Sequence, residues 1–178
     1  MNYIVFDLEA TCWEGSRWEE MEIIEIGAVL LDGEHFQPMA EFEQFVRPLN
    51  NPNLTEFCKE LTSIKQKQID AAPDFQVAFD WFMDWIGDKP FKLCAWGDFD
   101  AKMVNKECEQ HGKTLPSNFM GFMNLKELFA RAYDTKDNIG LREAMRKLSM
   151  PFEGRLHRGI DDARNIAAVA QTILMLDD

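Results

Sequence analysis

The distribution of apolar and polar residues predicts β-strands in the N-terminal part of the chain. Residues 3–9 are rich in strand-forming types, and residues 22–31 form an apolar run that ends at the turn dipeptide Asp32-Gly33. Residues 39–47 resume the strand pattern. Because turn signals separate these segments, they are predicted to form an antiparallel meander.

The remainder of the chain alternates between short apolar runs and helical spacing. Residues 75–87 carry Phe75, Phe79, Phe82 and Ile86 at helical intervals. Strands are predicted near 91–96 and 119–123, and further helices over 99–111, 124–133, 140–148 and 160–176. Strands followed by alternating strands and helices indicate an α/β fold, with one mixed sheet and helices on both faces.

Composition narrows the possible classes of protein. The chain has 178 residues, 46% hydrophobic and 12% aromatic, which is too apolar for a disordered protein. No repeat or linker divides it, so we expect a single domain over residues 1–178. The net charge of −12 gives no overall basic footprint. The protein therefore either does not bind nucleic acid, or binds it at a small site where metal ions supply positive charge.

The four cysteines (Cys12, Cys58, Cys94 and Cys108) have no C-x-x-C spacing, which argues against a zinc site or a redox motif. We interpret them as reduced thiols of a cytoplasmic protein. No secretory signal pattern opens the chain, and no apolar run approaches the roughly 20 residues that span a bilayer. We therefore expect no membrane association.

Two carboxylates stand near the end of the first predicted strand. Alternate strand residues share a face, so Asp7 and Glu9 point the same way, about 7 Å apart at the backbone. Ionised carboxylates in an apolar setting are costly unless they are neutralised. Their hard oxygen atoms suit Mg²⁺ or Mn²⁺. The alternative is a strand that runs out into solvent.

A strand–helix junction carries two further candidates in Trp96-Gly97-Asp98-Phe99-Asp100. Helical steps from Asp98 reach polar residues, whereas steps from Asp100 reach Val104 and Cys108. We therefore expect Asp98 to cap the helix through its side chain and Asp100 to point inward as the functional carboxylate. Both could instead be ordinary helix-start residues.

The sequence His157-Arg158-Gly159-Ile160-Asp161-Asp162 opens the last predicted helix. Asp162 precedes the apolar stripe of Ile166, Val169 and Ile173, whereas Asp161, Asn165 and Thr172 form a more polar face. Asp162 is therefore expected to point inward. A histidine five residues before such a carboxylate is a candidate general base, although a structural role is equally open.

Taken together, these residues resemble the DEDDh group of 3′→5′ exonucleases. The three motifs are F-D-L-E-A-T-C-W-E-G, A-W-G-D-F-D and H-R-G-I-D-D-A-R-N-I-A. The stretches E-A-T-C-W-E-G and F-C-K-E-L-T-S-I are most similar to exonucleases that trim histone mRNA ends and small interfering RNAs, and to the short bacterial KapD-type proteins. The resemblance covers about residues 3–174. It implies a ribonuclease H-like mixed five-stranded sheet, with three antiparallel strands followed by parallel strands.

The resemblance also implies a two-metal hydrolysis of phosphodiester bonds. Asp7, Glu9, Asp100 and Asp162 would hold two divalent cations, Mg²⁺ or Mn²⁺, and His157 would act as general base. The expected substrate is single-stranded nucleic acid, with RNA favoured over DNA, and the expected products are nucleoside 5′-monophosphates.

The residues matching the family's substrate-binding positions are Ala10, Thr11, Phe57, Leu61 and Phe99. Phe57 and Phe99 are equally compatible with a place in the core. Residues 140–158 contain five basic and two acidic residues, a local charge of +3. We expect Arg155 and Arg158 to guide the phosphate backbone; a solvated helix face is the alternative.

Two other functions remain compatible with the sequence. The enzyme could act on DNA or short oligonucleotides, because discrimination depends on 2′-OH contacts. Alternatively, the chain could be a non-catalytic regulatory module, since KapD-type proteins are associated with inhibition of a sporulation kinase pathway. The second alternative would require a protein partner, which the sequence does not identify. The complete set of five chemical residues favours the enzyme.

Overall fold

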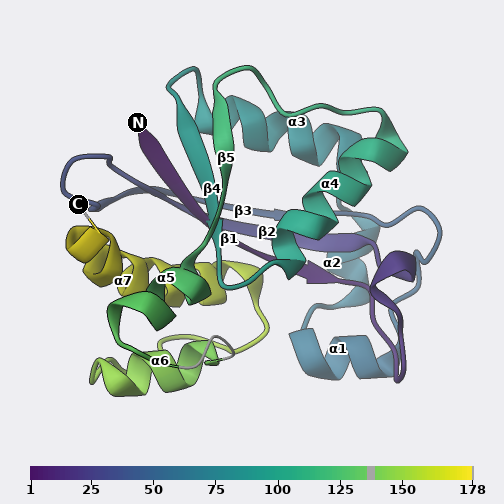
Figure 1. The fold of residues 1–178 in the computed structure, drawn as a ribbon. Helices are drawn as coiled ribbons and strands as arrows, with labels where there is room; N and C mark the ends of the chain where they lie inside the picture. Colours follow the sequence, from purple (N-terminus) through teal and green to yellow (C-terminus); the bar gives the residue numbers. More distant parts are fainter. Residues whose placement is uncertain (136–138, 178) are drawn as a thin grey trace.

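The computed structural model describes residues 1–135 and 139–177 and places one sheet between helices (Figure 1). Its elements, in chain order, are β1 (Asn2–Ala10), the 3₁₀ helix η1 (Trp18–Glu20), β2 (Ile23–Leu31), β3 (Pro38–Phe45), α1 (Glu56–Thr62), α2 (Gln66–Asp70), α3 (Phe75–Ile86), β4 (Phe91–Ala95), α4 (Phe99–His111), β5 (Phe119–Asn124), α5 (Leu125–Ala132), α6 (Leu141–Lys147) and α7 (Gly159–Asp177).

The sheet has five strands in the order β3-β2-β1-β4-β5. The β1–β2 and β2–β3 pairs are antiparallel, and the β1–β4 and β4–β5 pairs are parallel. This arrangement confirms the predicted mixed sheet, with a meander first and parallel strands after it.

Strand β1 lies at the centre of the sheet, but its two neighbours accompany it for different lengths. It pairs with β2 from Tyr3 to Ala10 and with β4 only from Asn2 to Val5. Strand β4 ends at Ala95, and Gly97 turns the chain away with a φ of 117°. Beyond Val5, the edge of β1 that faces β4 is therefore open.

Helices cover both faces of the sheet. Helices α3 and α4 contribute to a core that contains Ile4 and Phe6 of β1, and α5, α6 and α7 contribute to a second core that contains Val5. Figure 1 shows α3 and α4 on one side of the strands and α5, α6 and α7 on the other. The α7 residues predicted as an apolar stripe are buried, because this helix packs against β1 and β2.

Helices α1 and α2 are absent from the sequence-based expectations. Thr55 caps α1 by accepting a hydrogen bond from Cys58 N at 3.0 Å, and Ser63 ends it in a left-handed conformation with φ 62°. With seven and five residues, these helices are too short to give a clear periodic pattern.

All four cysteines are free and buried.

Among the described residues, no helix combines the length and the apolar character needed to cross a membrane.

The start of α7 lies directly against β2. A Cβ atom added to Gly27 would lie under 3.0 Å from the Gly159 carbonyl carbon and the Ile160 nitrogen. On the other side of this contact, a Cβ on Gly159 would lie 3.1 Å from Asp7 O. Two glycines thus allow the backbone before α7 to approach β1 and β2 closely.

We predict that Gly27→Ala destabilises the protein by about 3 kcal/mol, because backbone atoms have to move to admit the methyl group. Urea denaturation followed by circular dichroism measures this change. Gly140→Ala is the matched control, because a Cβ at Gly140 meets nothing within 4 Å. Equal stability of the two variants would contradict the proposed close approach.

Candidate active site

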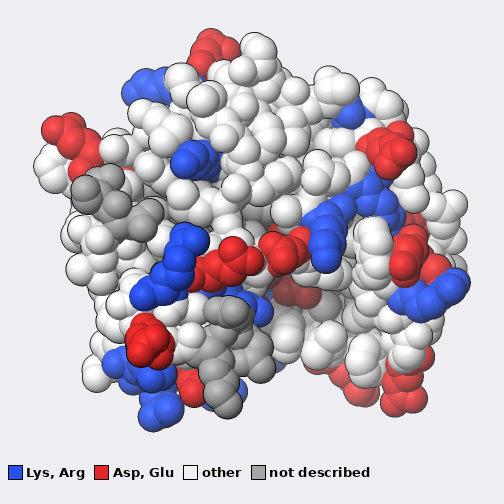
Figure 2. All heavy atoms as spheres, in the orientation of Figure 1, with Lys and Arg blue, Asp and Glu red and all other residues white. Residues whose placement is uncertain are grey.

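The five residues predicted to carry the chemistry line one cavity of about 420 Å³. They come from separate elements: Asp7 and Glu9 from β1, Asp100 from α4, Asp162 from α7, and His157 from the segment before α7. In Figure 2, acidic atoms lie in the hollowed centre of the face shown. The structure thus brings together all of the predicted acidic residues and the histidine.

The open edge of β1 is occupied by Asp100. Its carboxylate Oδ1 accepts a hydrogen bond from Leu8 N at 3.0 Å, and its side chain is buried at 5% exposure. This hydrogen bond replaces a strand–strand bond that β4 does not supply. It also fixes Asp100 beside Asp7 and Glu9.

Asp98 is exposed, as expected, but it does not cap α4 through its side chain. Its Oδ1 instead accepts a hydrogen bond from Asn124 Nδ2 at 2.9 Å. The expected cap was wrong, because the side-chain amide of Asn124, at the end of β5, binds this carboxylate.

His157 is held at the mouth of the cavity by Asp162. The backbone has a φ of 60° at His157, and its N–H donates to Asp162 Oδ2 at 2.7 Å. Ligand atoms of Glu9, His157 and Asp162 all lie within 4.8 Å of one another. Asp162 is buried and Asp161 is turned outward, where it pairs with Arg164 at 2.9 Å.

Asn165 departs from its predicted position on the polar face of α7. It is 3% exposed, because its side-chain amide donates to Glu153 O and Asp161 O, both at 2.7 Å. Its Oδ1 accepts from Glu153 N at 2.9 Å, which fixes the segment before His157 onto α7.

Burial raises the pKa values of all four carboxyl groups, and repulsion from nearby acidic groups adds to it. Burial is the largest cause at Asp7, followed by the charges of Asp100, Glu9 and Asp162, and the pKa of Asp7 lies well above its usual value. Burial and nearby acidic groups raise the pKa of Glu9 to about 9. The pKa values of Asp100 and Asp162 are raised to about 7 and about 6, chiefly by burial.

This donor set fits a divalent cation. The described residues that line the cavity include four carboxylates and a histidine but no lysine or arginine. Oxygen-rich sites of this kind suit hard cations such as Mg²⁺ and Mn²⁺. A cation held by Asp7, Glu9, Asp100 and Asp162 would offset the repulsion that raises their pKa values.

Three of the predicted substrate-binding residues line the cavity: Ala10, Leu61 and Phe99. Leu61 and Phe99 are 39% and 42% exposed, so both offer apolar surface at the mouth. Phe57 does not line the cavity; it is exposed on α1, one helical turn before Leu61. Phe57 and Phe99 are therefore not core residues.

The structure does not place Thr11 and Arg158 in the cavity. Thr11 is buried, and its Oγ1 accepts a hydrogen bond from Glu22 N at 2.9 Å. Arg158 turns toward the β2–β3 side of the sheet. It donates to Glu25 Oε2 at 3.2 Å and to Glu43 Oε1 at 2.9 Å. Its side chain is thus already engaged by two carboxylates of the protein.

Glu25 is a supporting residue that the sequence reasoning missed. It is fully buried, lies opposite Glu9 in the β1–β2 register, and also accepts a hydrogen bond from Gly159 N at 3.1 Å. The sequence feature that could have identified Glu25 is a carboxylate inside the apolar run of residues 22–31.

Three apolar residues that the sequence analysis did not select also line the cavity: Trp96, Leu141 and Leu156. In the sequence, nothing distinguishes apolar residues of a cavity wall from those of the core.

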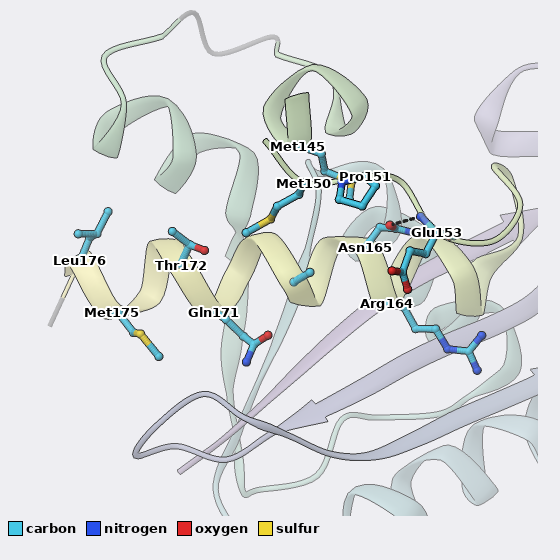
Figure 3. Close-up of a pocket in the computed structure, with 11 residues that line it drawn as sticks. Met145, Met150, Pro151, Glu153, Arg164, Asn165, Gln171, Thr172, Met175 and Leu176 are labelled. Carbon is cyan, nitrogen blue, oxygen red and sulfur yellow. Dashed lines mark hydrogen bonds between the residues drawn. The ribbon is translucent and has the colours of Figure 1, made fainter. Parts of the chain in front are cut away.

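A larger cavity of about 640 Å³ lies elsewhere, between the Met145–Glu153 part of the chain and α7 (Figure 3). Its carboxylate, Glu153, points near Arg164, and Asn165 is bonded to the Glu153 backbone. Among the described residues that line it, Glu153 is the one acidic residue, so the smaller cavity is the candidate active site.

The sequence model of the exonuclease family RNase_T matches residues 4–170. The structure is also similar to that of the nuclease domain of 3′hExo, described as a DEDDh family member bound to rAMP. That similarity has a TM-score of 0.89 at 33% identity and covers 98% of this chain and 92% of that one. The chain belongs to the DEDDh exonuclease family.

Two curated relatives show how much of a longer protein the chain covers. It is 34% identical to human ERI1 exoribonuclease 2 over 94% of this chain and 27% of the relative. It is 31% identical to the Drosophila melanogaster 3′-5′ exonuclease Snipper over 93% of this chain and 66% of that protein. The chain thus spans from about a quarter to about two thirds of the length of these relatives.

We predict that Arg158→Ala lowers the free energy of unfolding by about 3–5 kcal/mol, because it leaves the buried Glu25 without its counter-ion. Urea denaturation measures the change. Arg164→Ala is the matched control: it removes two surface ion pairs, to Glu41 of β3 and to Asp161, each worth at most about 1 kcal/mol. Equal losses for the two variants would argue against a special role of the buried pair.

We also predict that stability without metal falls as pH rises. The folded-state pKa values of Glu9, Asp100 and Asp162 lie between about 6 and about 9. In the unfolded chain such groups titrate near about 4. Between these values the folded state retains protons that the unfolded state has released, so the melting temperature in EDTA decreases from about pH 5 to about pH 9.

Adding Mg²⁺ or Mn²⁺ at alkaline pH is expected to reverse this decrease, by about 2.7 kcal/mol at a concentration a hundred times the Kd. Asp7→Asn is expected to flatten the pH dependence, whereas exposed Asp98→Asn leaves it unchanged. Differential scanning calorimetry measures the melting temperatures that test the effect of metal and of each of the two variants. A melting temperature that rises from pH 5 to pH 9 in EDTA would refute the electrostatic account.

Proposed function

We propose that this chain is a divalent-metal-dependent 3′→5′ exonuclease that removes nucleotides from single-stranded RNA or short 3′ overhangs and releases nucleoside 5′-monophosphates. The observation that carries the proposal is the convergence of Asp7, Glu9, Asp100, Asp162 and His157 on one cavity. We further propose that residues 1–178 act as one exonuclease domain in the cytoplasm.

Each residue has a role in this proposal. Asp7, Glu9, Asp100 and Asp162 would hold two cations, Mg²⁺ or Mn²⁺, which when bound activate water and stabilise the leaving oxygen. His157 accepts the proton of the attacking water on an imidazole nitrogen. The hydrogen bond from the backbone N–H of His157 to Asp162 Oδ2 holds the main chain of this residue beside the cavity.

The shape of the cavity supports a terminal nucleotide as substrate. Ala10, Leu61 and Phe99 provide apolar surface on which a base can lie. Stacking tolerates any base, so weak sequence preference is expected. RNA is favoured because relatives at 34% identity are named exoribonucleases and because the 3′hExo nuclease domain is described with bound rAMP.

The direct test is to incubate the purified protein with 5′-labelled and 3′-labelled single-stranded RNA and matched DNA, in Mg²⁺, Mn²⁺ or EDTA. We expect metal-dependent laddering from the 3′ end and faster cleavage of RNA. Asp100→Asn and His157→Ala are each expected to lower kcat by at least about a hundredfold, because each removes a group that acts in the reaction.

Matched controls come from neighbouring or equivalent exposed residues. Asp98→Asn removes a carboxylate two positions from Asp100, and His35→Ala removes an exposed histidine on the β2–β3 turn. Neither is expected to change activity. Equal cleavage of RNA and DNA would refute the RNA preference. Silence on both substrates in both metals would refute the enzyme and favour the regulatory module.

A further inference from the structure

The basic residues on and near α6 do not line the active-site cavity, so the proposed chemistry does not account for them. With Arg158 engaged by Glu25 and Glu43, the positive charge of residues 140–158 rests on Arg142, Arg146, Lys147 and Arg155. All four are exposed, and within the described part of the chain none of their side chains has an ion-pair partner. Figure 2 shows basic side chains at the lower left, over α6, with acidic ones among them.

Two of these arginines line a hollow. It has a volume of about 600 Å³ and is formed by Arg142, Glu143, Met145 and Arg146 together with the segment Ser149–Phe152. Arg142 and Arg146 are four residues apart and therefore share one face of α6. Phe152 is half-buried at the same place and offers an aromatic surface. We call this feature the α6 hollow.

Helix α6 and the segment that follows it each contribute residues to the α6 hollow and to the active-site cavity. On α6, Leu141 lines the cavity and the next residue, Arg142, lines the hollow. On the segment that follows α6, Phe152 lines the hollow, and Leu156 and His157 line the cavity. The same two stretches of chain thus contribute residues to both depressions, while the hollow shares Met145, Met150 and Pro151 with the larger cavity beside α7.

The segment after α6, which forms part of the wall of each depression, is fixed by hydrogen bonds. Met150 N donates to Met145 O at 2.9 Å, and Arg155 N donates to Asp161 Oδ2 at 2.9 Å. Between these two points, Glu153 is held by Asn165, as Figure 3 shows. The α6 hollow is thus held at a set position relative to His157, so a ligand could bind there without prior ordering of this wall.

The combination of charge and shape fits a single-stranded polynucleotide. Most of the surface of a chain with net charge −12 repels phosphates. The α6 hollow instead offers guanidinium groups that have no ion-pair partner among the described residues, beside an aromatic ring on which a base can stack. An extended substrate whose 3′ end occupies the cavity would pass this place.

We propose that the α6 hollow binds the sugar–phosphate backbone of the substrate upstream of its 3′-terminal nucleotide, with Arg142 and Arg146 each neutralising a phosphate. The inference rests on the proposed exonuclease function, which supplies the 3′ end in the cavity. It assigns a binding role to arginines that touch neither the acidic residues nor His157.

The test compares Arg142→Gln/Arg146→Gln with a control of equal charge change, Lys67→Gln/Lys89→Gln. Both control lysines are exposed and lie on α2 and before β4, away from the α6 hollow. The kcat/KM of each protein is measured on a long single-stranded RNA and on a dinucleotide, over a range of salt concentrations. Melting temperatures verify that the variants remain folded.

The arginine variant is expected to lose activity on the long RNA but not on the dinucleotide, which is too short to reach α6. Each lost phosphate contact should reduce the salt slope by about 0.7, so the deficit should shrink about sevenfold from about 50 to about 200 mM salt. Parallel losses on both substrates, the same loss in the lysine variant, or an unchanged slope would each overturn the proposal.

Failure of the proposed function gives a different result. If the parent protein cleaves neither substrate, fluorescence anisotropy of a labelled long RNA still measures binding without cleavage. Weaker binding by the arginine variant alone would support the α6 hollow as a polynucleotide site. Equal binding by all three proteins would overturn the proposal.

Discussion

A cluster of four carboxylates, three of them buried and one half-buried, is the constraint on which this structure depends. At Asp7, Glu9, Asp100 and Asp162, burial above all, and then the charges of neighbouring acidic groups, disfavour the ionised forms and raise the pKa values. A fold that holds such a cluster has to draw its stability from elsewhere. Here two apolar cores, one on each face of the sheet, provide it.

The contacts around the cluster hold it from several directions. Gly27 and Gly159 bring the start of α7 against β1 and β2, and the buried pair of Glu25 and Arg158 fixes the residue next to His157. These residues do not line the cavity. Their role is to hold in place a group of side chains that would otherwise separate, which is how a rigid scaffold supports a metal site.

The mixed sheet and the acidic residues of the site could be predicted from the sequence, because strand alternation and helical spacing are local patterns. Alternation in β1 placed Asp7 with Glu9, and helical spacing distinguished Asp100 from Asp98 and Asp162 from Asp161. Tertiary contacts explain the failures. The side chain of Arg158 turned to Glu25, a residue 133 positions away, and no local pattern encodes that choice. Likewise, Asn165 is buried because the backbone of Glu153 happens to lie beside it.

Because β1 pairs with β4 over only part of its length, its backbone has different hydrogen-bond partners in its two halves. Up to Val5 it is bonded to a strand on each side, whereas the amide of Leu8 relies on the side chain of Asp100. A carboxylate whose pKa is raised to about 7 thus serves as a backbone hydrogen-bond acceptor. The amide of Leu8 is consequently a local reporter of the active site: its hydrogen-exchange protection is linked to the ionisation of Asp100, and so to whatever binds that carboxylate.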